Sequence, residues 1–264
     1  MTTDPPAWAQ REVDGVTFFE QQAGNVRLGF TTRLGGVSTG AYGSLNLSFN
    51  VGDEPGAVAG NRARACRALD LGRLATVRQV HGDRVVAVGG TDLPGEDAEA
   101  DALCTDAPGI GIGVKVADCL PVFIFHPEGR CAGIAHCGWR GTAAGLGPKL
   151  ARAMSDRYRV PVRELSFSLG PCISPGRYPV GEDALGILSQ ALPAGPGFLR
   201  PASDPPHDRW LLDLRAANRA LLRELGLNET AGIEHCTWTE GRLFYSARRE
   251  HVTGRNLAAV VIRG

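Results

Sequence analysis

The sequence has no excess of charge of either sign. Its 264 residues include 28 Lys and Arg against 28 Asp and Glu, so the formal net charge is zero. Binding to a nucleic acid needs a surplus of cationic side chains on one face of the protein. We therefore expect no nucleic-acid partner, although a small local group of arginines could still bind phosphate.

Long apolar runs and secretion signals are also missing. The longest apolar run, residues 119–125, is far too short to cross a bilayer, and residues 1–14 lack the basic and then apolar layout of a signal peptide. Seven cysteines without such a leader are typical of free thiols in a reducing compartment. We expect a cytoplasmic protein that associates with no membrane.

The apolar fraction of 43% is sufficient for a real hydrophobic core. Helical spacing predicts helices over residues 54–71, with Asp53 as N-cap, and over 142–158, 181–192 and 213–225. Short β-rich runs bounded by Gly, Pro and Asp predict strands over 16–19, 26–32, 75–80, 84–88, 102–104, 110–116, 122–125, 131–136, 164–169, 232–237 and 257–262.

These helices and strands mix irregularly along the chain, without a fixed repeat or a break in composition. We predict one α+β domain with mixed sheets over residues 15–264, preceded by a flexible segment over residues 1–14. We expect no obligate protein partner.

Three side chains of metal-binding types stand where predicted strands end in turns, namely His81, Cys119 and His136. Their separations of 38 and 17 residues are too wide for a zinc finger, whose paired ligands lie two to four residues apart. The pattern suits a catalytic metal site with three protein ligands and an open fourth position. Buried histidine and core cysteines would give the same spacing, so this alternative stays open.

Further short motifs occur in order along nearly the whole chain. They are residues 31–38 (TTRLGGVS), 44–47 (SLNL), 51–53 (VGD), 61–62 (NR), 79–82 (QVHG), 100–101 (AD), 117–122 (ADCLPV), 136, 138–141 (GWRG), 170–173 (GPCI), 244–246 (FYS) and 253–255 (TGR). With these motifs the sequence resembles the YfiH-like family, long called laccase-domain or polyphenol oxidase proteins and later described as purine nucleoside phosphorylases.

The resemblance implies a zinc site formed by His81, Cys119 and His136. It also implies phosphorolysis of adenosine, inosine and methylthioadenosine to the base and (methylthio)ribose-1-phosphate, with possible deamination of adenosine. The implied fold is a single-domain α/β/β/α sandwich related to bacterial deamidating toxins. The small-molecule partners would be a nucleoside and phosphate.

Copper is reported in this family, but zinc fits the sequence better. Six histidines cannot supply a multinuclear copper oxidase, and a single copper site of two His and one Cys usually adds an axial Met. The two methionines are Met1 and Met154, and neither lies near the three candidate ligands in the sequence. We expect a redox-inert zinc ion.

Phosphorolysis needs an anion cradle and polar groups around the nucleoside. Arg33 and Arg140 lie in glycine-containing loops and are candidate phosphate ligands, although either could be purely structural. Gln79 would share a strand face with His81 and reach the substrate, and Asn46 is a similar polar candidate.

Two aspartates accompany the metal-binding candidates. Asp118 or Asp101 could act as a base or, the interpretation we favour, orient a metal-bound histidine. Asp118 is therefore counted with His81, Cys119 and His136 among the catalytic candidates.

The alternative function is a Cys/His hydrolase or amidase that uses Cys172 or Cys119 with His136. A zinc-stabilised binding module would instead need a fourth ligand. The neighbouring Cys137 should point away from His136 in a strand and pack in the core.

Overall fold

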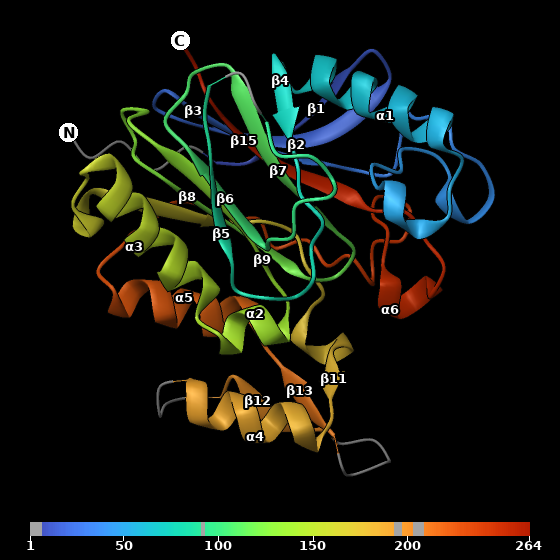
Figure 1. Ribbon diagram of the computed structural model, residues 1–264. Coiled ribbons are helices and arrows are strands. Elements are labelled where there is room, and N and C mark those ends of the chain that lie inside the picture. The colour runs from blue at the N-terminus through green and yellow to red at the C-terminus, as the bar shows by residue number, and fades with distance from the viewer. Residues whose placement is uncertain (1–6, 91–92, 193–196, 203–208) are drawn as a thin grey trace.

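The computed structural model describes residues 7–90, 93–192, 197–202 and 209–264. Two six-stranded sheets stack face to face, and helices cover the outer face of each (Figure 1). This is the predicted α+β sandwich with α/β/β/α layers. No helix within the described ranges is long and apolar enough to span a membrane.

The first sheet has mixed pairing, with only its last pair parallel. Its order is β1 (Ala9–Val13), β2 (Val16–Ala23), β3 (Val26–Thr31), β15 (Asn256–Ile262), β7 (Ile110–Val116) and β4 (Arg73–Ala75). Helix α1 (Pro55–Ala68) covers its outer face, where Ala65 packs with Phe18 and Ala259.

The second sheet is also mixed, with parallel pairs at its two edges. Its order is β14 (Asn228–Glu229), β10 (Ser166–Leu169), β8 (Leu120–Phe125), β9 (Ala132–Cys137), β6 (Ala102–Thr105) and β5 (Val85–Val88). Its outer face carries helices α2 (Trp139–Ala143), α3 (Leu146–Tyr158) and α5 (Leu214–Glu224). Helix α4 (Glu182–Ala191) packs against α2, and α6 (Ala247–Glu250) lies apart from these helices. A small sheet of β11 (Pro179–Val180), β13 (Trp210–Leu212) and β12 (Leu199–Pro201) lies beside α4.

The central strands are buried on both faces, and their alternation separates the two cores. In β8, Phe123 and Phe125 pack against the first sheet, whereas Val122 and Ile124 pack against the helices. Because successive strand residues point to opposite faces, an apolar residue is needed at every position of such a strand. The sequence around β8 therefore reads as a continuous apolar run.

Two predicted helices differ from the structure, one in its interior and one at its start. The helix predicted over 142–158 is divided into α2 and α3, because Gly145 adopts a left-handed φ of 67° between them. Helix α1 takes Glu54 rather than Asp53 as its N-cap, since the Glu54 carboxylate accepts from the amide of Ala57. Asp53 is instead held by the hydroxyl of Ser38.

Three further predictions about the chain differ from the structure. Residues 232–237 form no strand, because their backbone makes only scattered hydrogen bonds, such as the one from Ile233 to Leu169, rather than a ladder. The strand predicted over 75–80 ends at Ala75. The expected flexibility of residues 1–14 is wrong for residues 9–13, which pair with β2, while residues 1–6 lie outside the described ranges.

Gly133 allows α3 to approach β9 closely. A Cβ atom there would lie 2.6 Å from Sδ of Met154 and 3.1 Å from a methyl of Leu150, both of them buried. We expect Gly133→Ala to lower the free energy of unfolding by about 1–3 kcal/mol through overpacking. Urea denaturation measures this change.

The matched control is Gly186→Ala in α4, where a Cβ would meet open space. This substitution should raise the free energy of unfolding by about 0.5–1 kcal/mol, because alanine favours a helix interior. Equal effects of the two substitutions would contradict the close packing of α3 on β9.

Candidate active site

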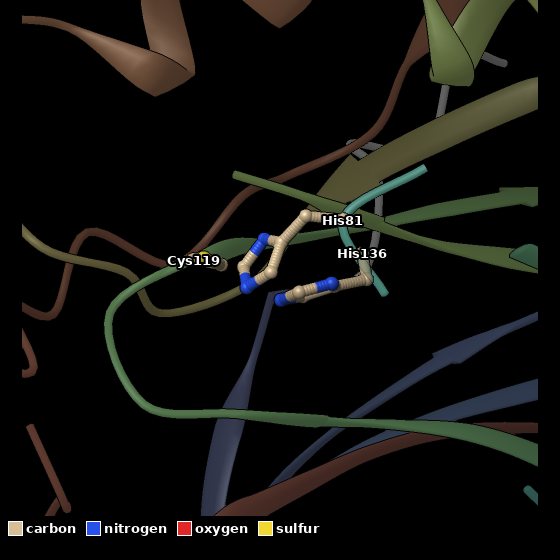
Figure 2. Close-up of side chains that lie close together, drawn as sticks. All are labelled: His81, Cys119 and His136. Carbon is tan, nitrogen blue, oxygen red and sulfur yellow. The ribbon is translucent and has the colours of Figure 1, made fainter. Parts of the chain in front are cut away.

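The structure brings His81, Cys119 and His136 together. Their ligand atoms all lie within 4.8 Å of one another, and Figure 2 shows the two imidazoles and the thiol side by side. His136 belongs to β9, Cys119 directly precedes β8, and His81 lies in the loop between β4 and β5. His136 is buried, Cys119 half-buried and His81 exposed, so the group opens to solvent on one side.

Asp101 is the buried centre of this arrangement. One carboxylate oxygen lies 2.9 Å from Nδ1 of His136 and 3.1 Å from the amide nitrogen of His81. The other oxygen accepts hydrogen bonds from the amides of Val80 and Gly82, at 3.1 and 2.7 Å. One carboxylate therefore fixes both histidine-bearing segments, including the left-handed φ of 58° at His81.

Burial and neighbouring charges shift the pKa values of Asp101, His136 and His81. Burial alone would raise the pKa of the Asp101 carboxyl, but the bonds from His136 and the backbone amides outweigh it and the pKa is lowered. Burial would lower the pKa of His136, yet Cys119 and Asp101 raise it to about 9. Burial and the neighbouring His136 lower the pKa of His81. With Nδ1 of His136 held by Asp101, Nε2 is the nitrogen available to a ligand.

These donors fit a single divalent metal ion. Two imidazoles and one thiolate are a typical three-ligand set, and a carboxylate that orients one histidine is the usual support for such a site. Gly138 leaves room for them, since a Cβ there would lie 2.9 Å from Sγ of Cys119 and 3.3 Å from Nδ1 of His81. Within the described ranges this is the one group of three or more metal-binding side chains.

The three side chains line a cavity of about 430 Å³, a volume suited to a small organic ligand. The wall comes from segments far apart in the sequence. Its other residues are Ser48, Asn50, Val51, Gln79, Lys115, Ala117, Asp118, Tyr178, Ala247, Arg248, His251 and Arg255.

Asp118 and Gln79 line the cavity, and the side chain of each is hydrogen-bonded to other protein groups. The Asp118 carboxylate accepts from the hydroxyl of Thr237 and the amide of Arg248, both at 2.7 Å. The Gln79 amide bonds both backbone groups of Lys115 at 2.8 Å, as a neighbouring strand would. The role of orienting a histidine belongs to Asp101 rather than Asp118.

The remaining predicted substrate ligands lie away from the cavity. Arg33 is bonded to Glu250 and to the carbonyls of Gly43 and Gly241, and it does not line the wall. Arg140 is exposed, with its guanidinium 4.3 Å from the ring centre of Trp139.

Asn46 is fully buried behind the wall. Its amide oxygen accepts from the amides of Ser48 and Arg255, at 3.1 and 3.0 Å. It therefore holds neighbouring loops rather than facing the cavity.

Two cysteines take structural positions. Cys172 is buried outside the cavity, and burial raises its pKa to about 12, so it has no route to a substrate and little thiolate character. Cys137 packs in the core beneath the helices, on the face of β9 opposite to His136, as the alternation predicted.

Three residues of the wall, Arg248, His251 and Arg255, are not among the predicted site residues. Arg248 and His251 come from α6 and the residue after it, and Arg255 from the segment before β15. Arg255 ends the TGR motif over residues 253–255, which contributes to the family resemblance, but no role was predicted for the arginine. Nothing local in the sequence distinguishes Arg248 or His251, because only the fold brings them beside His81.

The chain is similar in sequence to one described protein family and to several bacterial purine nucleoside phosphorylases. The family described as "Multi-copper polyphenol oxidoreductase laccase" matches residues 27–263. Purine nucleoside phosphorylase YlmD of Geobacillus stearothermophilus is 33% identical over 244 residues, which cover 88% of each chain. A purine nucleoside phosphorylase of Deinococcus radiodurans is 38% identical over 240 residues, covering 88% of this chain and 87% of that protein.

Solved structures agree with these sequence matches. The crystal structure of YlmD from Geobacillus stearothermophilus has a TM-score of 0.89 at 31% identity and covers 98% of this chain and 100% of its own. That of the Bacillus licheniformis protein YfiH has a TM-score of 0.86 at 28% identity, covering 96% and 99%.

We expect Asp101→Asn to weaken metal binding by about 10- to 100-fold, because an amide NH₂ cannot accept the hydrogen bonds that the carboxylate accepts. Zinc titration against a chromophoric chelator measures the affinity. Asp83→Asn is the control, since this exposed carboxylate bonds Lys149 and should not affect the metal. Wild-type affinity in Asp101→Asn would contradict the positioning role.

Gly138→Ala should likewise weaken zinc binding, by about tenfold or more, because the added methyl would displace the Cys119 thiol. Gly181→Ala is the matched control, because both glycines are helix N-caps in an extended conformation, with φ of −73° at Gly138 and −86° at Gly181. A Cβ at Gly181 would face open space. The same titration should find the control unchanged. Equal affinities for both variants would show that Gly138 plays no part in the metal site.

Proposed function

We propose that this chain, which belongs to the YfiH-like family of multi-copper polyphenol oxidoreductase laccase proteins, is a zinc-dependent purine nucleoside phosphorylase. It would cleave adenosine, inosine and methylthioadenosine with phosphate to give the base and (methylthio)ribose-1-phosphate. The observation that carries this proposal is the triad of His81, Cys119 and His136 on the wall of a 430 Å³ cavity. The phosphorylase names of the relatives support it.

In this reaction an oxygen of phosphate forms a bond to C1′ of the ribose as the bond from C1′ to the purine nitrogen breaks. The electron pair of the broken bond leaves with the purine, which takes up the proton that phosphate gives up. The ribose passes through a cationic state, so anionic groups near it and exclusion of bulk water would favour the reaction.

His81, Cys119 and His136 would hold zinc, and the bound ion would supply a Lewis acid beside the substrate. Asp101 keeps His136 in one tautomer and orientation, so its role is to position a ligand. Asp118 places a carboxylate on the same wall. It accepts hydrogen bonds from Thr237 and Arg248, and its remaining lone pairs could accept from a ribose hydroxyl. Its negative charge could stabilise the positive charge that develops on the sugar.

Zinc suits this site better than copper. Six histidines in the sequence and one three-ligand group in the described residues are too few for a multicopper centre. All seven cysteines are free thiols, which supports a reducing compartment, and we propose the cytoplasm.

Deamination of adenosine is a proposed side activity of the same site. The sequence lacks the usual H-x-E and P-C-x-x-C signature of zinc deaminases, so another carboxylate would have to act as base. Asp101 is completely buried and bonded to four donors. Asp118, which lines the cavity, is the better candidate.

A Cys119–His136 hydrolase is the second candidate function, because this thiol hydrogen-bonds a histidine whose pKa it raises. The version with Cys172 has no support from the structure, since that thiol is buried outside the cavity.

We expect His81→Ala and Cys119→Ala to lose both zinc and phosphate-dependent release of base, by roughly a thousandfold or more. Mass spectrometry of reactions with and without phosphate identifies the products. Ribose-1-phosphate reports phosphorolysis, free ribose reports hydrolysis and inosine reports deamination.

Cys172→Ala is the control and should keep both zinc and activity. Phosphate-dependent cleavage by the metal-free His81→Ala protein would overturn the zinc mechanism. Loss of activity in Cys172→Ala with zinc retained would favour a cysteine nucleophile instead.

A further inference from the structure

Arg255 lines the cavity, and half of its guanidinium has no protein partner among the described residues. Both hydrogens of Nη1 are used, in bonds to the carbonyls of Thr253 and Gly254 at 2.9 and 3.0 Å. Within the described residues, Nε and Nη2 have no acceptor. This Nε–Nη2 edge is the fork that makes paired hydrogen bonds to carboxylate or phosphate oxygens.

The charge of Arg255 is also uncompensated. Other half-buried arginines pair with carboxylates, such as Arg33 with Glu250 and Arg62 with Glu96, but Arg255 has no such ion pair among the described residues. Burial lowers its pKa, although Cys119 and Asp118 act in the opposite direction. A guanidinium taken from water without a counter-ion destabilises a protein, which is tolerated where a ligand supplies the opposite charge.

Asn46 fixes Arg255 in this position. The amide of Arg255 donates to the side-chain oxygen of Asn46 at 3.0 Å, and its carbonyl accepts from the amide of Leu47 at 3.2 Å. Asn46 is itself fully buried and bonded to Asp53. Asn46 thus fixes the backbone of Arg255, while the two carbonyl bonds of Nη1 hold the guanidinium. A side chain positioned before a ligand arrives loses less entropy on binding.

Arg248 and His251 share this wall, and the side chains of both can donate hydrogen bonds to an anion. Arg248 bonds the carbonyl of Pro179 through Nη1 and lies 5.2 Å above the ring of Tyr178. Lys115 lines the same cavity, but it is bonded to Glu96 and its charge is neutralised. Arg255 lines the same cavity as His81, Cys119 and His136, so an anion bound here would share the cavity with the candidate metal ligands.

We propose that Arg255, with Arg248 and His251 beside it and Asn46 as its positioning residue, forms the subsite for a phosphate dianion. The ligand is inorganic phosphate, the second substrate of the proposed reaction, so this inference rests on the proposed function. It replaces Arg33, whose donors bind protein groups, and Arg140, which lies outside the wall. The same chemistry could accept the 5′-phosphate of a nucleotide, and the experiment separates these two sources.

The first measurement is binding of inorganic phosphate to the zinc-loaded protein by isothermal titration, without nucleoside. We expect Arg255→Gln to weaken binding by roughly 10- to 100-fold, since it removes a paired, charge-assisted contact. The phosphate affinity of Arg255→Lys should lie between those of the wild type and Arg255→Gln, because lysine keeps the charge but cannot make the paired hydrogen bonds of a guanidinium. Arg67→Gln on the exposed face of α1 is the matched control, and Arg140→Gln should also be unchanged.

The second measurement separates binding from structure. In the nucleoside reaction, Arg255→Gln should raise KM for phosphate by a similar factor and leave KM for the nucleoside unchanged. Its melting temperature without phosphate should change little, because removal of a half-buried charge without a counter-ion offsets the loss of the two Nη1 hydrogen bonds. Phosphate should stabilise the wild type but not the variant. A purely structural arginine would lower the melting temperature and leave the phosphate affinity alone.

Three results would overturn the proposal. They are unchanged phosphate affinity in Arg255→Gln, the loss appearing in Arg140→Gln instead, or weaker binding of adenosine 5′-monophosphate with unaltered binding of inorganic phosphate. If phosphate binding depends on Arg255 but the wild type cleaves no nucleoside, the subsite stands and the proposed function fails.

Discussion

The site depends on one buried carboxylate. Asp101 has no exposure to solvent, and it accepts hydrogen bonds from three successive backbone amides and one imidazole. Burying a charge is favourable only when such donors replace water around it. The loop of His81 and the ring of His136 therefore cannot move independently. The geometry of the candidate metal site is set from behind, by a residue that need not touch the metal.

The sequence predicted the part of the site that follows from local patterns. The residue types at predicted turns indicated His81, Cys119 and His136, although the strand expected before His81 ends at Ala75. Strand alternation placed Cys137 in the opposite core. Local patterns predicted one α+β domain with mixed sheets, and the α/β/β/α layers followed from the family resemblance. Gly145 divided a predicted helix because its left-handed backbone is invisible to hydrophobic spacing.

The cationic wall could not be predicted in this way. An arginine in a glycine-rich loop has the same local signature whether its guanidinium is engaged by protein, as in Arg33, or has a free edge, as in Arg255. Only the carboxylates and carbonyls that the fold brings near decide between these outcomes. Asn46 illustrates the same limit, because its polar side chain is fully used in holding two loops together.

The position of β15 has a consequence for the synthesis of this protein. Residues 256–262 form a central strand of the first sheet, between β3 and β7, and every residue of the strand is buried (Figure 1). Until the ribosome has released this segment, β3 and β7 have no common partner. Folding of the first sheet and assembly of the cavity must therefore follow translation of these residues, and the nascent chain exposes unpaired strand edges until then.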